Sequence, residues 1–288
     1  MRYSTVIPGS RWSDDIASQD RALDGHLSVG DVVVSYAVAS DGVGSHDGSQ
    51  LAAELAVRIV DRAFADLESA WEEAKPTQED IEGAVRQIVA ELPGRVAKVF
   101  DLISTDCRAS EDPLYATLLL GVVVGSDAEE DAPSWAACWI CGDGSVFIGQ
   151  EDGIATTHPA RGEPETLTGR CAVEVTDDFG RCVPCTTMDL ALEGRGVPKR
   201  MSGRRRGMGL RLAAESRGRI FGVAVATDGL KHHEEVGEKL RRMLQGEDPE
   251  ATTDIMSGAW ETQARLKSAN AKAFGSYVDD FGIAVVLR

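Results

Sequence analysis

The chain has 288 residues, of which 43% are hydrophobic and 27% charged, so it can build one domain with a sizeable core. Its 30 basic and 47 acidic residues give a net charge of −17, which argues against general binding to nucleic acids or anionic membranes. No apolar run approaches the roughly 18 residues of a membrane-spanning helix. The first residues lack the apolar stretch of a signal peptide, so we expect a cytoplasmic protein.

The first clear strand signal is Val32–Ser40, an apolar run that ends at Asp41 and Gly42. The aspartate places a carboxylate at the strand end, and the glycine leaves the neighbouring backbone accessible. An earlier aspartate, Asp20, stands near the N-terminus. An Asp-Gly pair on its own is more often a turn than a ligand pair, so the case for a binding site depends on further acidic strand ends.

Two helices are predicted after this strand. Apolar residues recur at helical spacing over 49–67. A second helix begins at Thr77, because Thr77 and Asp80 have the spacing of a capping box. Pro93 and Gly94 should interrupt this helix, since proline has no N–H to donate, and helical spacing resumes beyond them.

Three apolar, strand-like runs follow, at 116–125, 135–141 and 145–150. From 159 to 218 the pattern weakens into Gly, Pro and charged residues, and we interpret this range as a flap or loop insertion in a single domain. Two more helices are expected, at about 234–245 and 249–273. Strands and helices come in blocks, which favours an α+β fold with helices covering antiparallel sheets.

A second strand signal with an acidic end is Ile220–Thr227, which runs into Asp228 and Gly229. A third acidic position, Asp279-Asp280, precedes the last apolar run of the chain. Carboxylates that are brought together repel one another unless they share protons or bind a hard cation. The sequence therefore predicts a divalent-metal site assembled from the whole chain, which requires both chain ends to join one domain.

The six cysteines include two Cys-x-x-Cys pairs, Cys138/Cys141 and Cys182/Cys185, which have the spacing of a zinc site or a redox pair. The first pair lies in a strand-like run, where residues three apart point to opposite faces of the sheet. That geometry disfavours a shared metal ion. Buried thiols in a reducing compartment are the interpretation that we favour.

Five short segments, in chain order, carry a family resemblance: Ser18–Asp20, Ser40–Ala52, Ile140–Ser145, Ala226–Leu230 and Val278–Val286. They resemble five segments of the PPM or PP2C family. In the same order, these are Asn-Glu-Asp, an Asp-Gly strand end with a glycine-rich turn, Gly-Asp-Ser-Arg, Ser-Asp-Gly-Leu and Asp-Asn. These are metal-dependent Ser/Thr protein phosphatases. Each segment alone is a weak signal, but together they follow the family order over nearly the whole chain.

The resemblance implies a four-layer αββα sandwich of two antiparallel sheets flanked by helices, with two Mn²⁺ or Mg²⁺ ions at one end. The implied ligands are Asp20, Asp41, Asp228, Asp279 and the carbonyl oxygen of Gly42. Alignment with the family's Asp-Asn pair favours Asp279 over Asp280. Asp143, together with Asp228, would serve a third and weaker metal ion.

The chemistry of phosphate ester hydrolysis agrees with these residue types. Two hard cations about 4 Å apart lower the pKa of a bridging water and clamp the phosphoryl oxygens. Carboxylates suit Mg²⁺ or Mn²⁺, whereas zinc would call for His or Cys. The activated water is expected to attack phosphorus without a covalent phosphoenzyme. His46 is a candidate proton donor to the leaving alkoxide, and the alternative is that it braces the glycine-rich turn.

The chain also departs from the family pattern. Asp15 replaces the arginine that contacts phosphate five residues before the first aspartate, and Arg11 is the nearest substitute. Gln19 replaces an acidic residue. The eight basic residues of the segment 199–219 form either a flap that meets phosphorylated substrate or a solvated loop. Similar departures occur in a divergent bacterial branch of the family.

The sequence is compatible with three functions. The leading hypothesis is a phosphatase acting on phosphoserine or phosphothreonine in a phosphoprotein, which would oppose a Ser/Thr kinase. The second is a catalytically silent PPM-like module that binds a phosphoprotein or a regulator. The third is another metal-dependent hydrolase, a small phosphomonoesterase or a nuclease, of which the nuclease is disfavoured by the net charge.

Overall fold

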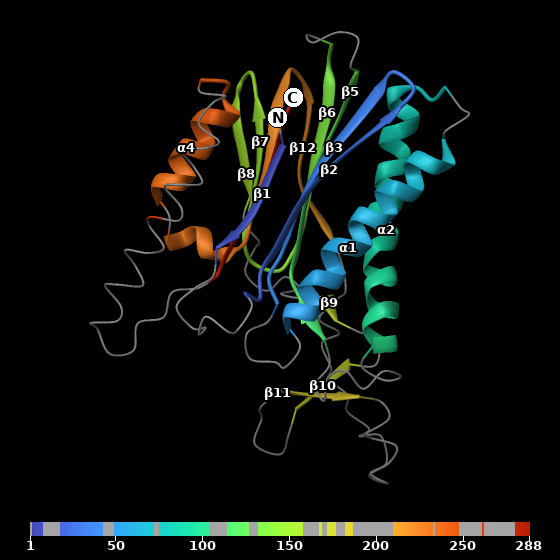
Figure 1. The fold of residues 1–288 in the computed structure, drawn as a ribbon, viewed down its shortest axis with the longest axis vertical. Coiled ribbons are helices and arrows are strands. Elements are labelled where there is room, and N and C mark those ends of the chain that lie inside the picture. Colours follow the sequence, from blue (N-terminus) through green and yellow to red (C-terminus); the bar gives the residue numbers. More distant parts are fainter. Residues whose placement is uncertain are drawn as a thin grey trace.

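The computed structural model describes residues 2–7, 18–42, 49–71, 75–103, 114–126, 132–157, 167–168, 172–176, 182–186, 210–232, 234–247, 261 and 280–288. Two five-stranded antiparallel sheets pack face to face, and helices cover both outer faces (Figure 1). The predicted α+β fold, an αββα sandwich, is confirmed. Among the described residues, no helix is both long and apolar enough to cross a membrane.

The first sheet has the strand order β1 (Arg2–Ile7), β14 (Phe281–Leu287), β13 (Ile220–Ala226), β7 (Ser145–Gln150) and β8 (Gly153–Thr157). The second sheet has the order β12 (Arg211–Gly218), β6 (Ser134–Cys141), β5 (Leu118–Ser126), β3 (Val32–Ser40) and β2 (Arg21–Val29). In the first sheet, the first and last described strands of the chain are neighbours, with Arg2 opposite Val286. Both ends of the chain therefore belong to the same sheet.

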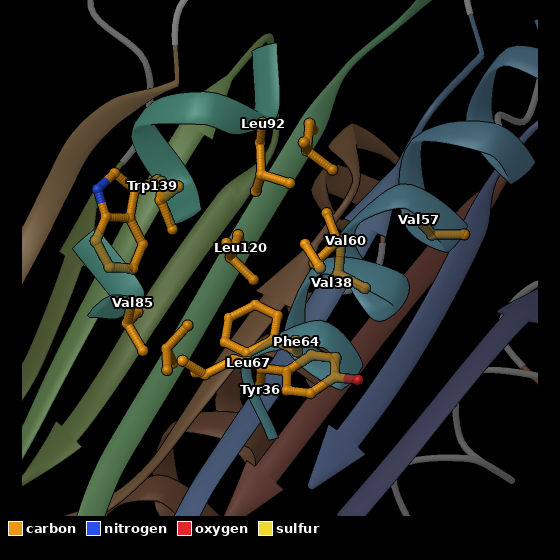
Figure 2. Close-up of a cluster of buried hydrophobic side chains, with 14 of the residues drawn as sticks. Tyr36, Val38, Val57, Val60, Phe64, Leu67, Val85, Leu92, Leu120 and Trp139 are labelled. Carbon is orange, nitrogen blue, oxygen red and sulfur yellow. The ribbon is translucent and has the colours of Figure 1, made fainter. Parts of the chain in front are cut away.

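Helices α1 (Ser49–Ala70) and α2 (Gln78–Asp101) cover the outer face of the second sheet. Figure 2 shows side chains from both helices meeting side chains of β3, β5 and β6 in a buried apolar cluster. Tyr36 of β3 stacks on Phe64 of α1, with ring centroids 4.3 Å apart. The amphipathic stripe predicted for 49–67 faces this cluster, and its burial holds the helix on the sheet.

Helix α2 starts as predicted and continues where an interruption was predicted. The Thr77 side chain accepts the Asp80 N–H at 3.2 Å, and the Asp80 carboxylate accepts the Thr77 N–H at 2.9 Å, which completes the capping box. The interruption predicted at Pro93 is wrong, because the helix runs through it to Asp101. Buried residues on both sides, among them Leu92 and Val96, keep this part of the helix against the sheet.

On the opposite side, α4 (Glu234–Leu244) covers the first sheet and confirms the helix predicted at 234–245 (Figure 1). Its residues Leu240 and Leu244 are buried against a cluster that includes Phe147 and Ile283. The short 3₁₀ helix η2 (Asp228–His232) connects β13 to α4. The helix predicted at 249–273 lies outside the described residues except for Glu261.

The range 159–218, interpreted as a flap or loop, contains more sheet than expected. Strands β10 (Ala172–Thr176) and β11 (Cys182–Thr186) form a hairpin, and β9 (Leu167–Thr168) pairs with β4 (Tyr115–Ala116). Strand β12 is an edge strand of the main second sheet, paired with β6. The loop interpretation is therefore wrong for Arg211–Gly218.

Strand β12 is also fixed to helix α2. The Arg217 guanidinium forms two hydrogen bonds to the buried carboxylate of Glu82, through Nη1 at 3.1 Å and through Nη2. Glu215 accepts hydrogen bonds from Trp135 Nε1 at 2.6 Å and from Arg86 Nη2 at 2.5 Å. Part of the basic segment thus serves the fold, because Arg217 neutralises a buried carboxylate.

The first Cys-x-x-Cys pair has the geometry expected of a strand. Cys138 is buried in the core between the two sheets, whereas Cys141 is buried in the core between the second sheet and its helices. The two thiols thus lie on opposite faces of β6. Burial raises the pKa of the Cys138 thiol, which disfavours the thiolate that a metal ion would need.

Candidate metal centre

Strand ends that are far apart in sequence meet at one end of the sandwich. Antiparallel pairing sets Arg21, the first residue of β2, opposite Ser40, the last residue of β3. The flanking aspartates Asp20 and Asp41 are therefore neighbours.

In the first sheet, the end of β13 and the beginning of β14 meet in the same way. The Thr227 N–H donates to the carbonyl oxygen of Gly282 at 2.9 Å. The Gly282 N–H donates to Thr227 Oγ1 at 2.8 Å. This two-way contact holds Asp228, the next residue of the chain, beside Asp280 at the start of β14.

Thr227 also connects the two sheets at this end. Its hydroxyl donates a hydrogen bond of 2.5 Å to Asp20 Oδ2, and both residues are buried. The pKa of Asp20 is raised to about 7, mainly by burial and in addition by the nearby charges of Asp280 and Asp228. Hydrogen bonds from Thr227 and with Asp41 act in the opposite direction. Four carboxylates thus lie close enough to affect one another.

Backbone contacts hold Asp41 in place. The Asp41 N–H donates to Thr117 Oγ1 at 2.8 Å, and the Thr117 N–H donates to the Asp41 carbonyl oxygen at 2.8 Å. The next residue, Gly42, donates its N–H to the Gln19 carbonyl oxygen at 3.2 Å. A Cβ at Gly42 would lie 2.1 Å from the Ser49 carbonyl oxygen, so glycine is required where α1 begins against the strand end.

Gly229 has a similar role after Asp228. A Cβ at this position would lie 2.0 Å from the Asp280 carbonyl oxygen. The second Asp-Gly pair is therefore packed directly against the start of β14. In both pairs the glycine allows backbone segments to approach closely, and this approach brings the aspartate to the shared end of the sandwich.

Asp280 is the acidic residue that sequence reasoning did not select. It is buried, and its Oδ2 accepts the backbone N–H of Gln19 at 2.7 Å. Its position directly before an apolar strand was a signal, but alignment with the family's Asp-Asn pair favoured Asp279. Asp279, Arg11 and His46 lie outside the described residues.

Asp143 lies on the turn that joins β6 to β7. Gly142 and Gly144, on either side of it, have φ angles of 111° and 134°, which favour glycine. Asp143 itself is exposed. A Cβ at Gly144 would lie 2.7 Å from the Ala226 carbonyl oxygen, so the turn packs against the end of β13, two residues before Asp228.

The oxygen donors at this end suit a hard divalent cation. Carboxylates and backbone carbonyls are the ligands preferred by Mg²⁺ and Mn²⁺, and a cation would offset the repulsion that acts on Asp20. Within the described part of the chain, no three His, Cys, Asp or Glu side chains are close enough to form a complete ligand set. The described oxygen donors are therefore of the type that such a metal ion prefers, but they do not by themselves make up a complete ligand set.

This chain matches the model of a known protein family and resembles solved structures. A family model described as protein phosphatase 2C matches residues 9–267. The fold resembles the crystal structure of a bacterial serine phosphatase, with a TM-score of 0.52 and 13% identity over 99% of this chain and 96% of the other. Serine/threonine phosphatase Stp1 from Staphylococcus aureus gives a TM-score of 0.49 and 12% identity over 100% of this chain and 94% of the other.

No curated protein matches this chain by sequence. The structural similarity, at such low identity, shows the fold. The family model covers most of the chain, and the acidic strand ends lie together at one end of that fold. The chain belongs to the protein phosphatase 2C family.

Proposed function

We propose that this protein is a metal-dependent phosphatase that hydrolyses phosphoserine and phosphothreonine in phosphoproteins. The observation that carries the proposal is the meeting of Asp20, Asp41 and Asp228, which come from three distant parts of the chain. Like charges placed around a buried carboxylate such as Asp20 are costly in a fold, and metal binding is a function that makes use of them. Membership of the family adds the reaction class.

The proposed ligands of two or three Mn²⁺ or Mg²⁺ ions are Asp20, Asp41, Asp228, Asp279 and the Gly42 carbonyl oxygen, with Asp143 serving a third ion. When bound, such ions supply an activated water and positive charge that stabilises the phosphoryl oxygens. Other residues of the chain position these ligands. Thr227 orients Asp20 through its hydroxyl, and Thr117 holds the backbone of Asp41 from both sides.

Two further roles complete the proposal. Arg11 would contact the substrate phosphate, and His46 would donate a proton to the leaving alkoxide. The net charge of −17 makes a local positive centre necessary, because the field of the whole protein repels a phosphate dianion. A phosphoprotein substrate, made by a Ser/Thr kinase, is the partner that this chemistry implies.

The test is hydrolysis of p-nitrophenyl phosphate and then of a phosphothreonine peptide, each with Mn²⁺, with Mg²⁺ and with EDTA. We expect turnover that needs the metal ion and falls by at least about a hundredfold in Asp228→Asn. The matched control is Asp152→Asn, an exposed aspartate in the turn between β7 and β8, which should keep wild-type turnover.

Other outcomes would contradict the proposal in different ways. A folded protein that binds Mn²⁺ but turns over neither substrate would indicate the catalytically silent module. Turnover of p-nitrophenyl phosphate without turnover of the phosphopeptide would indicate a small-molecule phosphomonoesterase. Equal activity of wild type and Asp228→Asn would place the reaction elsewhere on the chain.

A further inference from the structure

A cavity of about 220 Å³ lies at the other end of the sandwich. Its lining comes from the strand ends of β1, β2, β3, β5 and β14 that are farthest from the aspartates. Figure 1 marks both chain ends together at the top of the sandwich, and Arg2 and Arg288 line this cavity. The cavity is thus separate from the candidate metal centre.

The cavity continues the apolar core between the two sheets. Val123 and Val286 belong to that core and also form walls of the cavity. Ser35 lies on the same face of β3 as the core residues Ala37 and Ala39, because side chains alternate along a strand. The wall between the two sheets is therefore largely apolar and carries the hydroxyl group of Ser35.

Two arginines and a histidine also line the cavity. Arg2 is directly opposite Val286 in the antiparallel register, so its side chain lies on the face that looks toward the second sheet. His26 contributes a ring nitrogen, Nδ1, which lies 3.2 Å from Ser35 Oγ. Arg288 adds a second guanidinium.

The Arg288 guanidinium is held in a defined position. It donates to the carbonyl oxygens of Ser126 at 2.9 Å and Ala132 at 2.7 Å, and also to the hydroxyl of Ser134. A Cβ at Gly125 would lie 3.1 Å from its central carbon, so glycine leaves the room in which this side chain lies. A guanidinium fixed in advance loses little entropy when it binds an anion.

The charge of the lining differs from that of the chain as a whole. None of the residues that line the cavity is acidic, although the chain has 47 acidic residues. Asp24 lies on the same face of β2 as His26 but does not line the cavity. Within the described part of the chain, Arg2 makes no ion pair or hydrogen bond, so its guanidinium is available to an anion.

We propose that this cavity binds a small organic anion, a carboxylate with a short apolar tail. The carboxylate would meet Arg2 and Arg288, since guanidinium groups match carboxylates in geometry. The tail would lie against the valine wall. A volume of about 220 Å³ is below the roughly 300–1,000 Å³ of sites for drug-sized ligands, which limits the ligand to a small molecule.

The experiment is a titration of the ¹⁵N-labelled full chain with sodium hexanoate, followed by amide chemical shifts. The protein is metal-free, so that coordination at the aspartates does not contribute. We expect saturating shifts at the cavity strands, around Ser35 and Val123, and none around Asp41. Acetate, which lacks the tail, and hexan-1-ol, which lacks the charge, should each bind at least about tenfold more weakly.

Two variants test the assigned residues. Arg2→Ala should weaken hexanoate binding at least about fivefold, because one of the two guanidinium groups is lost. Ser35→Leu should abolish binding by filling the cavity, and it keeps the proposal testable if Arg2→Ala does not fold. The matched control is Arg62→Ala, which removes an exposed arginine of α1 and should leave binding unchanged.

The proposal is overturned if hexanoate causes no shifts at the cavity strands, if hexan-1-ol binds as tightly as hexanoate, or if folded Arg2→Ala binds like wild type. Asp228→Asn separates this inference from the proposed function. That variant should lose phosphatase turnover and keep hexanoate binding, because Asp228 lies at the opposite end of the sandwich.

Discussion

The backbone N–H of Gln19 donates a hydrogen bond of 2.7 Å to the Asp280 carboxylate, and the two residues are 261 positions apart. Gln19 precedes β2 of the second sheet, and Asp280 precedes β14 of the first. This bond, like the Thr227–Asp20 bond, forms only when both sheets have assembled. The candidate metal centre is therefore a product of the complete fold.

Removing the Asp280 carboxylate should leave the buried Gln19 N–H without its acceptor. We expect Asp280→Ala to lower the free energy of unfolding by about 1–3 kcal/mol. Asp280→Asn keeps an acceptor oxygen and should cost less than half as much. Urea unfolding of the metal-free proteins measures both, and equal stability of Asp280→Ala and wild type would show that the bond contributes nothing.

Replacing Thr227 tests how Asp20 is positioned. Thr227→Val keeps the shape of the side chain but loses the hydroxyl that donates to Asp20 and accepts from Gly282. We expect kcat/KM to fall by roughly tenfold or more, since a misplaced ligand costs much activity. Thr227→Ser retains the hydroxyl and should recover most of the activity. A fully active Thr227→Val would contradict the role of this bond.

Glycine at position 229 should be necessary for the packing of the second acidic strand end. Its substitution by alanine places a Cβ 2.0 Å from the Asp280 carbonyl oxygen, so Gly229→Ala should destabilise the protein by about 2 kcal/mol or more. A Cβ added at Gly237, in α4, would have no atom within 4 Å outside its own helix backbone and chain neighbours. Gly237→Ala should leave stability unchanged or raise it by about 0.5 kcal/mol. Thermal unfolding of both variants measures these changes in stability, and equal stability of Gly229→Ala and wild type would contradict the close packing at Gly229.

The hydrogen bonds to Glu215 should make stability depend on acidic pH. The Trp135 hydrogen bond, followed by that of Arg86, lowers the pKa of Glu215 below its ordinary value of 4.5. Because the folded-state pKa is lowered, the stabilisation is complete above about pH 4.5 and is lost as pH falls through the folded-state pKa.

Glu215→Gln should therefore lower Tm by about 2–3 °C near pH 6, and this difference should shrink toward pH 3. The control is Glu238→Gln on α4, whose ion pair with Arg241 is exposed and should change Tm little at either pH. A difference for Glu215→Gln that is constant with pH would mean that its charge is not involved.

Local patterns in the sequence predicted the parts of the fold that depend on local signals. The capping box at Thr77 and Asp80 fixed the start of α2 from two residues, and the stripe over 49–67 indicated the buried face of α1. The runs that end at Asp41 and Asp228 are strongly apolar because both of their faces are buried. Such strands are recognisable without knowledge of their partners.

The misses depend on partners that are distant in sequence. Strand β12 lies at a sheet edge, is only partly buried, and has an irregularity in register between Leu212 and Ala214. These features remove the regular alternation by which a strand is recognised. Pro93 is tolerated because packing on both sides outweighs the hydrogen bond that proline lacks.

Local sequence patterns also could not predict the details at the two ends of the sandwich. Whether Asp279 or Asp280 faces Asp20 depends on where β14 begins, which the adjacent pair of aspartates does not reveal. The cavity lined by Arg2 and Arg288 depends on how the two sheets pack, so no run of residues could indicate it.

We propose that aspartates from distant strand ends form a metal centre. The most direct measurement is isothermal titration of Mn²⁺ into metal-free wild type, Asp41→Asn and Asp228→Asn. We predict at least two Mn²⁺ ions per wild-type chain, with affinity at least about tenfold weaker in each variant. The absence of Mn²⁺ binding in wild type, or equal binding in all three folded proteins, would show that these aspartates do not form a metal centre.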